Sequence, residues 1–324
     1  MLNIRGQQKN KGILLAIFIG FIALIIKRSV NSAVFDPLVV AMILGILIRS
    51  FFKFSKEMVA GLAKVPETFI PLGVILYGAV NLNFTKIFTV DTSHIFLLFI
   101  VFIVYIVSAV VLSSLFGLNE KTGYLIATGS AICGASAITI ASKAIDAEPD
   151  DVSISLLPVF LSALIGLFIV LPFIRFVFSF EDMGYGVLAG TVLQFTGFVK
   201  ASVAGLPAEV KTIALSIKAI RYVGLLLVIP LFASFVKGKM YFPWYLWCFL
   251  GAGVLCSFAP DTAAVLRPTF KLILNILWSI AMAAIGLNAN LKDLFTKRGL
   301  RAFFASFISF MLAVSVFIIG TIYI

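Results

Sequence analysis

The sequence predicts an all-α polytopic membrane protein, because it is rich in apolar residues, poor in charge, and divided into long apolar segments. Apolar residues fill 62% of the 324 positions, against roughly 45–50% in a soluble domain. Charged residues make up 12%, about half the usual share, so too few charges exist to cover a water-soluble surface. This composition excludes a cytosolic enzyme, a nucleic-acid-binding protein and a disordered chain.

About eleven segments are apolar enough to be transmembrane helices, since a helix of about 20 apolar residues crosses a bilayer while satisfying its own backbone groups. The expected spans are 12–27, 34–52, 67–83, 94–116, 121–145, 151–178, 183–205, 208–236, 241–260, 268–290 and 301–324. Residues 53–65 mix Lys and Glu with apolar side chains, which is typical of an interfacial helix; a plain loop is the alternative. No linker marks a second domain, so we expect one transmembrane transport domain over residues 1–324.

The basic residues predict the orientation of the chain and its location. With the N-terminus inside, fifteen Lys and Arg residues fall in cytoplasmic segments and eight on the opposite side. The positive-inside rule therefore predicts a multi-pass protein of the cell (plasma or inner) membrane with a cytoplasmic N-terminus. The net charge of +11 is then a property of loops, and we expect lipid and a small anion as partners, with no nucleic acid. A homodimer remains open, and neither a metal nor a cofactor is expected, because no paired ligand spacing is present.

Two internal similarities suggest repeats. Residues 129–138 pair with 190–199 at an offset of 61, which predicts a two-helix unit that recurs in the same orientation. Residues 77–88 pair with 285–295, allowing one gap, and their spans should run in opposite directions. Such antiparallel pairs are typical of transporters with inverted repeats.

Small and hydroxyl residues crowd the middle of the span that contains residues 127–142. Close helix packing explains such a cluster. A broken helix that faces a substrate also explains it, and a half-helix N-terminus suits an anion. The polar residues of the matching segment, including Gln194 and Lys200, favour two broken helices; Lys200 would guard the outer mouth or snorkel. The candidate substrate-binding residues of the two segments are Gly129, Ser130, Cys133, Gly134, Ser136, Gly190, Thr191, Gln194, Thr196 and Lys200.

Lys218 and Arg221 complete the set of candidate substrate-binding residues. They lie three residues apart on one helix face, near the middle of span 208–236. The acidic residues fall at span ends or in loops, so backbone carbonyls, dipoles or a bound anion must compensate these cations. We expect an anion, the alternatives being two snorkelling side chains or a deprotonated Lys218. The absence of a mid-span carboxylate also argues against a carboxylate-driven Na⁺/H⁺ antiporter.

Taken together, the run 127–142, the Gly190-Thr191 segment, residues 218–221 and the near-terminal run 281–291 resemble the YeiH family over most of the chain. That family comprises prokaryotic membrane proteins named as sulfate exporters. It is grouped with the cation:proton antiporter and anion transporter superfamily, so the resemblance implies inverted repeats and crossed, broken helices. In the family pattern the second motif carries His-Asp and then Thr-Ser, where this chain has Gln194-Phe195 and then Thr196-Gly197. The missing titratable pair argues against proton coupling through this motif.

The residues and the resemblance together predict a secondary active transporter that moves a small inorganic or sulfur-containing anion, such as sulfate or sulfite, by alternating access. An organic-anion transporter and an anion channel are the alternatives. No enzyme is expected, because the spans contain no paired His/Asp, Glu/His or metal-ligand spacing.

Overall fold

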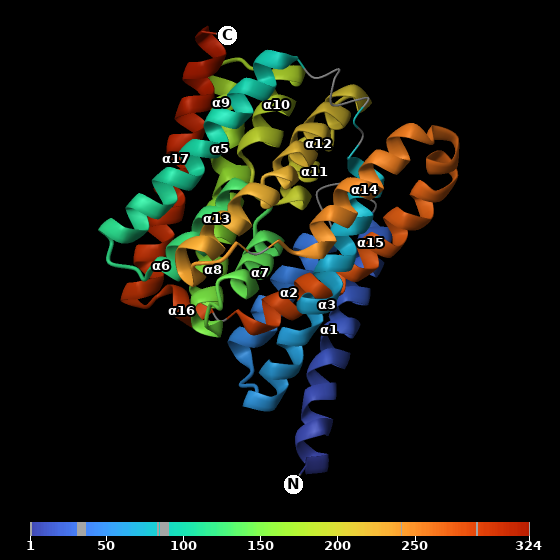
Figure 1. Ribbon diagram of the computed structural model, residues 1–324, viewed down its shortest axis with the longest axis vertical. Coiled ribbons are helices and arrows are strands. Elements are labelled where there is room, and N and C mark those ends of the chain that lie inside the picture. Colours follow the sequence, from blue (N-terminus) through green and yellow to red (C-terminus); the bar gives the residue numbers. More distant parts are fainter. Residues whose placement is uncertain are drawn as a thin grey trace.

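The structure is a computed structural model that describes residues 2–30, 37–82, 84, 91–240, 242–289 and 291–323. Every regular element among these residues is a helix (Figure 1). Seven helical segments are long and apolar enough to cross a membrane, which confirms the all-α membrane class: Gln7–Val30, Lys56–Val80, Thr92–Leu115, Asp150–Val177, Ala208–Lys237, Pro260–Asn288 and Lys297–Ile322. Two shorter helices are also apolar, Pro37–Phe51 and Trp244–Phe258.

Five helices pack mainly on one another and form what we call the panel. Their bounds are α1 (Leu2–Val30), α2 (Pro37–Phe51), α3 (Lys56–Asn81), α14 (Trp244–Phe258) and α15 (Pro260–Asn288). In Figure 1 the panel is the blue, cyan and orange part of the ribbon. Helices α3 and α15 run in opposite directions, as expected for the pair 77–88 and 285–295; residues 83, 85–90 and 290 of that pair lie outside the described residues.

The remaining helices form a second group, the core, which meets the panel along one side. Their bounds are α5 (Thr92–Leu115), α6 (Glu120–Ala131), α7 (Ala135–Ala144), α8 (Pro149–Ile165), a π-helical turn (Gly166–Val170), α9 (Leu171–Val177), α10 (Asp182–Val192), α11 (Thr196–Ser202), α12 (Ala208–Val223), α13 (Leu225–Lys237), α16 (Leu291–Leu294) and α17 (Lys297–Tyr323). The π turn precedes Pro172, which has no N–H to donate to the helix.

The charged stretch 53–65 is not a separate helix: residues 53–55 form a short loop, and residues 56–65 are the first turns of α3, so neither expectation describes all of it. Ser55 caps α3 by accepting a hydrogen bond from the Met58 amide at 3.3 Å, and the helix then continues without a break into the apolar span. Gly61 explains this position of the helix, because a Cβ there would clash with the Lys9 carbonyl oxygen. The first turns of α3 are therefore packed against α1.

The expected spans 121–145 and 183–205 are broken, and the first of them does not cross the molecule. Lys121, at the start of α6, donates to the carbonyl of Asp146, beyond the end of α7, at 2.7 Å. Because the two ends of this segment lie together, α6 and α7 form a re-entrant hairpin. Its base is held by Asp151 of α8, which accepts from Arg298 Nη2 at 2.6 Å and from Asn119 Nδ2 at 2.7 Å.

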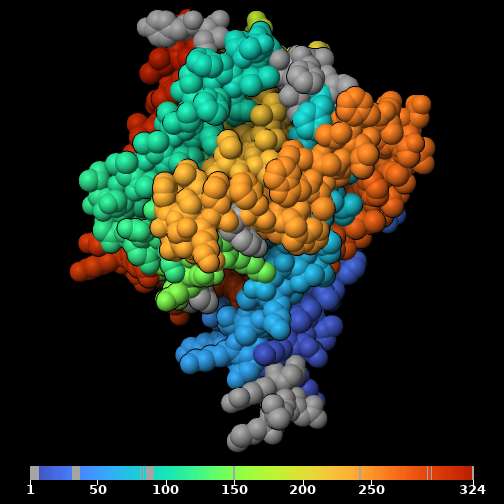
Figure 2. All heavy atoms as spheres, viewed as in Figure 1, coloured from blue at the N-terminus to red at the C-terminus, as the bar shows by residue number. Residues whose placement is uncertain are grey.

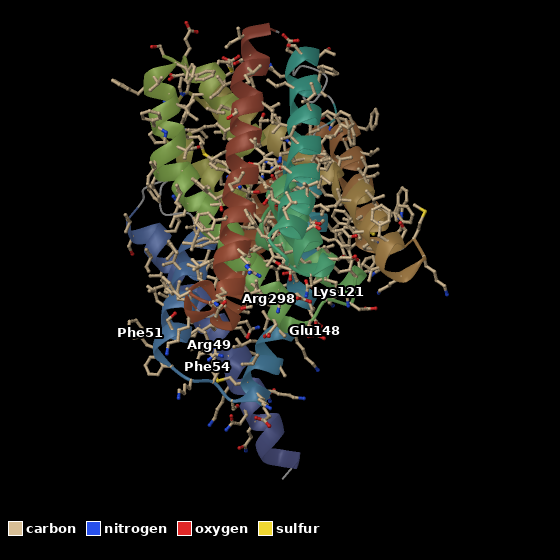
Figure 3. All side chains as sticks on the ribbon, turned by 90° about the vertical axis from the view of Figure 1, so that its left-hand side faces the viewer. Arg49, Phe51, Phe54, Lys121, Glu148 and Arg298 are labelled. Atoms are coloured by element: carbon tan, nitrogen blue, oxygen red, sulfur yellow. The ribbon has the colours of Figure 1, made fainter. Side chains whose placement is uncertain are left out.

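Helices α10 and α11 form a second re-entrant hairpin, which enters from the other end of the molecule. Gly186 and Gly190 of α10 pack against Val210 and Ala214 of α12 in the same order, so α10 and α12 run parallel and α11 returns between them. The base of this hairpin follows α9, whereas the first base precedes α8 at the opposite end of the same continuous helical segment. Figure 3 shows Lys121, Glu148 and Arg298 gathered at the first base. Residues 129–138 and 190–199 therefore belong to hairpins that enter from opposite ends of the molecule, and the expected common orientation of the two segments is wrong.

Within the panel, α2 and α15 cross at glycines that bring their backbones together. A Cβ on Gly286 would clash with the Met42 carbonyl oxygen, and one on Gly45 would lie 2.6 Å from the Ala283 carbonyl oxygen. Such close approach is available only to residues without a side chain, and dispersion contacts across it replace the hydrophobic driving force that lipid removes.

We predict that Gly286→Ala lowers the melting temperature of the detergent-purified protein by several degrees, because overpacking a close contact costs about 1–3 kcal/mol. Gly251→Ala on α14 is the matched control, since nothing lies within 4 Å of a Cβ there. Thermal unfolding followed by intrinsic fluorescence makes the comparison. Equal melting temperatures for the two variants would show that the α2–α15 crossing is not tight.

Candidate functional site

The tips of the two hairpins meet in the middle of the core. The first tip turns at Gly134, whose φ of +67° favours glycine, and the second turns through Leu193 to Phe195. A Cβ on Gly134 would lie 2.5 Å from the Phe195 ring, so the aromatic side chain of one tip covers the backbone of the other. Helices α6 and α10 therefore end, and α7 and α11 begin, at one buried place.

The Lys218 side chain joins the two tips. Its ammonium group donates to the carbonyl oxygens of Ile132 at 2.6 Å, Leu193 at 2.7 Å and Gln194 at 2.6 Å. An ammonium has three N–H donors, so these carbonyls use all of them. The side chain is fully buried. Lys218 is therefore compensated by backbone carbonyls, which is one of the three compensations that the sequence left open.

Arg221 binds the last turns of α6 and α10 in the same way. Its Nε donates to Ala131 and its Nη2 to Ser130, at 2.8 and 2.7 Å. Its Nη1 donates to both Thr191 and Leu193, at 2.7 and 2.8 Å. The last carbonyls of a helix have no partner within the helix, and here two cations supply the partners that water would supply elsewhere. None of the ion pairs between described residues includes either cation.

The hairpin tips consequently carry a positive charge. The C-terminal ends of α6 and α10 contribute partial negative charge of about half an elementary charge each, and the N-termini of α7 and α11 contribute similar positive charge. These four dipole ends nearly cancel, whereas Lys218 and Arg221 remain. Among the described residues, no group of three or more His, Cys, Asp or Glu side chains is placed to hold a metal ion.

A small cavity lies where the tips face the panel. Its volume is about 20 Å³, which is room for about one water molecule. Cys133, Ser136 and Thr196 line it from the tips, and Tyr222 lines it from α12; the panel contributes Leu38, Val39, Met42, Trp278 and Met282. Ser136 Oγ donates to Cys133 Sγ at 2.9 Å, and the Thr196 and Tyr222 hydroxyls are 3.2 Å apart. Phe160 and Phe195 also line the cavity from the core, so the few hydroxyl and thiol groups lie within a wall that is mostly apolar on both sides.

Three polar side chains beside the cations lack hydrogen-bond partners. Ser130 Oγ, Thr191 Oγ1 and both amide atoms of Gln194 are buried and make no hydrogen bond within the described part of the chain. An unsatisfied buried donor or acceptor costs about 1–3 kcal/mol. Each of the three residues is held in place by its own carbonyl, which binds Lys218 or Arg221. The tips therefore offer hydrogen-bonding groups that this arrangement does not use.

The other candidate residues lie near the tips without lining the cavity. Gly129 lets α6 approach Ile138 of α7, because a Cβ on Gly129 would lie 2.8 Å from that side chain. Gly190 lets α10 approach Ala214 of α12, because a Cβ on Gly190 would lie 2.6 Å from the Ala214 carbonyl oxygen. These two glycines shape the hairpins through close packing. Lys200 lies in the last turn of α11 and is half-buried, so it is placed toward the base of the second hairpin.

The sequence did not identify the aromatic residues of the site. Tyr222 stacks on Tyr77 of α3 with ring centroids 4.3 Å apart, and Tyr77 stacks on Trp278 of α15 at 5.3 Å. Tyr222 directly follows Arg221 in sequence, which is a weak signal for a role at the tips. Tyr77 and Trp278 come from separate spans, and nothing in the local sequence brings them together.

Comparison with known proteins places the chain in a family of membrane proteins. Residues 11–306 match the family described as conserved hypothetical protein 698. A UPF0324 membrane protein of Archaeoglobus fulgidus is 28% identical over 95% of this chain and 92% of its own length. The UPF0324 inner membrane protein YeiH of Salmonella typhi is 27% identical over 82% of this chain and 80% of its own length. No solved structure matches the chain.

We predict that Lys218→Met strongly destabilises the protein, because three buried carbonyls lose their partner. Each buried carbonyl left without a hydrogen bond costs about 1–3 kcal/mol. Lys211→Met is the control, since it makes the same substitution on α12 two turns earlier, outside the buried set. Thermal unfolding in detergent should show a large decrease in melting temperature for the first variant and little change for the second. Similar melting temperatures for the two variants would show that Lys218 does not stabilise the hairpin tips.

Proposed function

The chain belongs to the conserved hypothetical protein 698 family of UPF0324 membrane proteins, and from this membership and its paired hairpins we propose that it is a secondary active transporter of a small anion. The observation that carries the proposal is the meeting of two re-entrant hairpins at a buried, positively charged place. Irregular backbone at membrane depth is tolerated only where it is buried in protein or lines a cavity. Transporters use such broken helices to expose backbone groups to a substrate.

The opposite orientations of the two hairpins support alternating access. A hairpin and the helix after it, α6 to α8, correspond to a second hairpin and its following helix, α10 to α12, turned end to end. Inverted repeats of this kind give a protein two related conformations that open toward opposite faces. In this proposal nine helical segments cross the bilayer, the hairpins do not, and the N-terminus is cytoplasmic.

The charge at the tips favours an anion as the substrate. Lys218 and Arg221 are uncompensated by carboxylates within the described residues, and a buried charge without a counter-ion costs several kcal/mol. All three donors of Lys218 already bind carbonyls, so we propose that its charge acts over a distance. Direct hydrogen bonds would come from Gln194, Ser136 and Thr196. We propose sulfate or sulfite as the substrate, because its oxygens accept hydrogen bonds from amide and hydroxyl donors of this kind, and an organic anion is the second candidate.

The small volume of the tip cavity favours a carrier over a channel. A volume of about 20 Å³ is too small for an oxyanion together with its hydration water, so the tips must rearrange to bind one. A channel needs a continuous path in its open state, whereas a carrier needs a site that opens to one face at a time.

We expect the purified protein, reconstituted in liposomes, to take up radiolabelled sulfate or sulfite with saturable kinetics. Protein-free liposomes are the control, and competition by carboxylates distinguishes an organic-anion transporter. Single-channel current steps in planar bilayers would contradict the carrier mechanism. Absence of flux for every anion tested, in protein that remains folded, would refute the proposed function.

We predict that Gln194→Met lowers the rate of anion transport without lowering the stability of the protein. Its amide atoms make no hydrogen bond to any of the described residues, so replacing them with an apolar side chain of similar size should leave the melting temperature unchanged or raise it. Sulfate flux should decrease about 10–100-fold, because a hydrogen bond to a charged group is worth about 1.5–3 kcal/mol. Gln7→Met, at an exposed position of α1, is the control. Normal flux in Gln194→Met would remove this side chain from the binding site.

A further inference from the structure

A large vestibule lies between the panel and the core, apart from the small tip cavity. Its volume is about 660 Å³, within the range of about 300–1,000 Å³ that is usual for small-molecule sites. Helices α3 and α15 form its panel wall, while α7 and α8 form its core wall. Figure 2 shows the surface hollowed here, between the light-green segment around residue 145 and the blue segment of α3.

Three helices lead from this vestibule to the tip cavity in consecutive turns. On α7, Thr139 and Ser142 line the vestibule and Ser136 lines the tip cavity. On α8, Ser153 and Leu156 are followed by Phe160 in the same way, and on α15 Asn288 and Ile285 are preceded by Met282. Because each helix contributes to both spaces, the vestibule ends next to the hairpin tips. Its lining includes Asp146 and Ala147 at the base of the first hairpin and Lys56 at the start of α3. In Figure 1 these helix ends lie on the side of the molecule toward the N-terminus.

The opposite direction is blocked by aromatic side chains. Tyr222 of the core and Tyr77 and Trp278 of the panel stack directly beyond the tip cavity, and all three are at most 3% exposed. Gly73 permits this arrangement, because a Cβ on it would clash with the Trp278 indole nitrogen. The contact joins panel to core on the side of the tip cavity that faces away from the vestibule.

The charges of the vestibule balance. It is lined by two cations, Lys56 and Lys143, and by two anions, Glu67 and Asp146. Lys143 of α7 pairs with Glu67 of α3 at 3.4 Å, across the boundary between core and panel. Both side chains are nearly half exposed, and such a pair contributes at most about 1 kcal/mol, so it does not hold the two groups together. The vestibule therefore admits solutes without selecting them by charge.

We propose that this vestibule is the water-filled path by which a small anion reaches the hairpin tips from the face that carries the N-terminus, and that the Tyr77–Tyr222–Trp278 stack closes the opposite path. The hydroxyls of Thr139, Ser142 and Ser153 line the path, and selection for the anion takes place at the tips. The identity of the solute rests on the proposed function, whereas the geometry of the path does not.

Sided cysteine labelling tests the path without measuring transport. In full-length protein that carries Cys133→Ala, Cys248→Ser and Cys256→Ser, single cysteines are introduced as Ser142→Cys or Ser153→Cys. A membrane-impermeant methanethiosulfonate reagent is applied to right-side-out or inside-out vesicles. Both cysteines should react at least about tenfold faster from the face where an N-terminal epitope tag is accessible to antibody. Ser279→Cys, at a fully buried position of α15, is the matched control and should not react from either face.

Three outcomes would contradict the proposed path: equal reactivity from both faces, faster reactivity from the other face, or reactivity no greater than that of Ser279→Cys. The two vestibule positions are on different helices, so a folding defect in one variant leaves the other as a test. Sodium sulfate then tests the proposed function separately, on a Cys248→Ser, Cys256→Ser variant that retains Cys133. Slower labelling of Cys133 with sulfate present supports a shared path and substrate. Sided labelling at Ser142→Cys and Ser153→Cys without protection by sulfate would preserve the path and refute the substrate.

Discussion

The arrangement of the core depends on seven hydrogen bonds that two cations of α12 donate to the backbone of both hairpin tips. A helix that stops inside a membrane leaves its last carbonyls without partners, and no water is present there to satisfy them. Lys218 and Arg221 satisfy these groups and are satisfied by them. The same hydrogen bonds thus offset two unfavourable free energies: that of burying two charges and that of ending two helices at one buried place.

This constraint also makes the core a single unit. Since one helix binds both tips, any movement of a hairpin relative to α12 would break these hydrogen bonds, whereas a movement of the core relative to the panel would leave them intact. The contacts that cross the boundary between core and panel include an exposed ion pair, Lys143 with Glu67, and aromatic stacking of Tyr222 on Tyr77 and Trp278. Both kinds of contact depend less strictly on geometry than the hydrogen bonds from the two cations to the backbone carbonyls. Motion along this boundary would open and close the spaces on either side of the tips without breaking the core.

The cations therefore have a role that differs from simple substrate contact. Their N–H groups donate to backbone carbonyls, and these hydrogen bonds stabilise the fold. The positive charges of the two side chains remain at the tips and produce an electrostatic field there. Gln194 shows how the two roles meet: its carbonyl binds Lys218, and its side-chain amide remains without a partner. A single residue thereby fixes the tip and presents hydrogen-bonding groups at it. Substrate recognition by neutral polar groups in a positive field is consistent with this arrangement.

The sequence by itself determined the membrane class, the limits of most apolar helices, the positions of both helix breaks and the burial of Lys218 and Arg221. These features follow from local composition, because lipid requires apolar segments and only small or polar residues interrupt them. Tertiary structure decided the features that join distant segments. The contact of Lys121 with Asp146 turned a supposed span into a hairpin, and this reversed the direction of α8. Apolar composition is the same for a helix that crosses and for one that returns, so hydropathy cannot separate them. The partners of the cations were likewise backbone carbonyls, which every residue possesses and which no sequence pattern reveals.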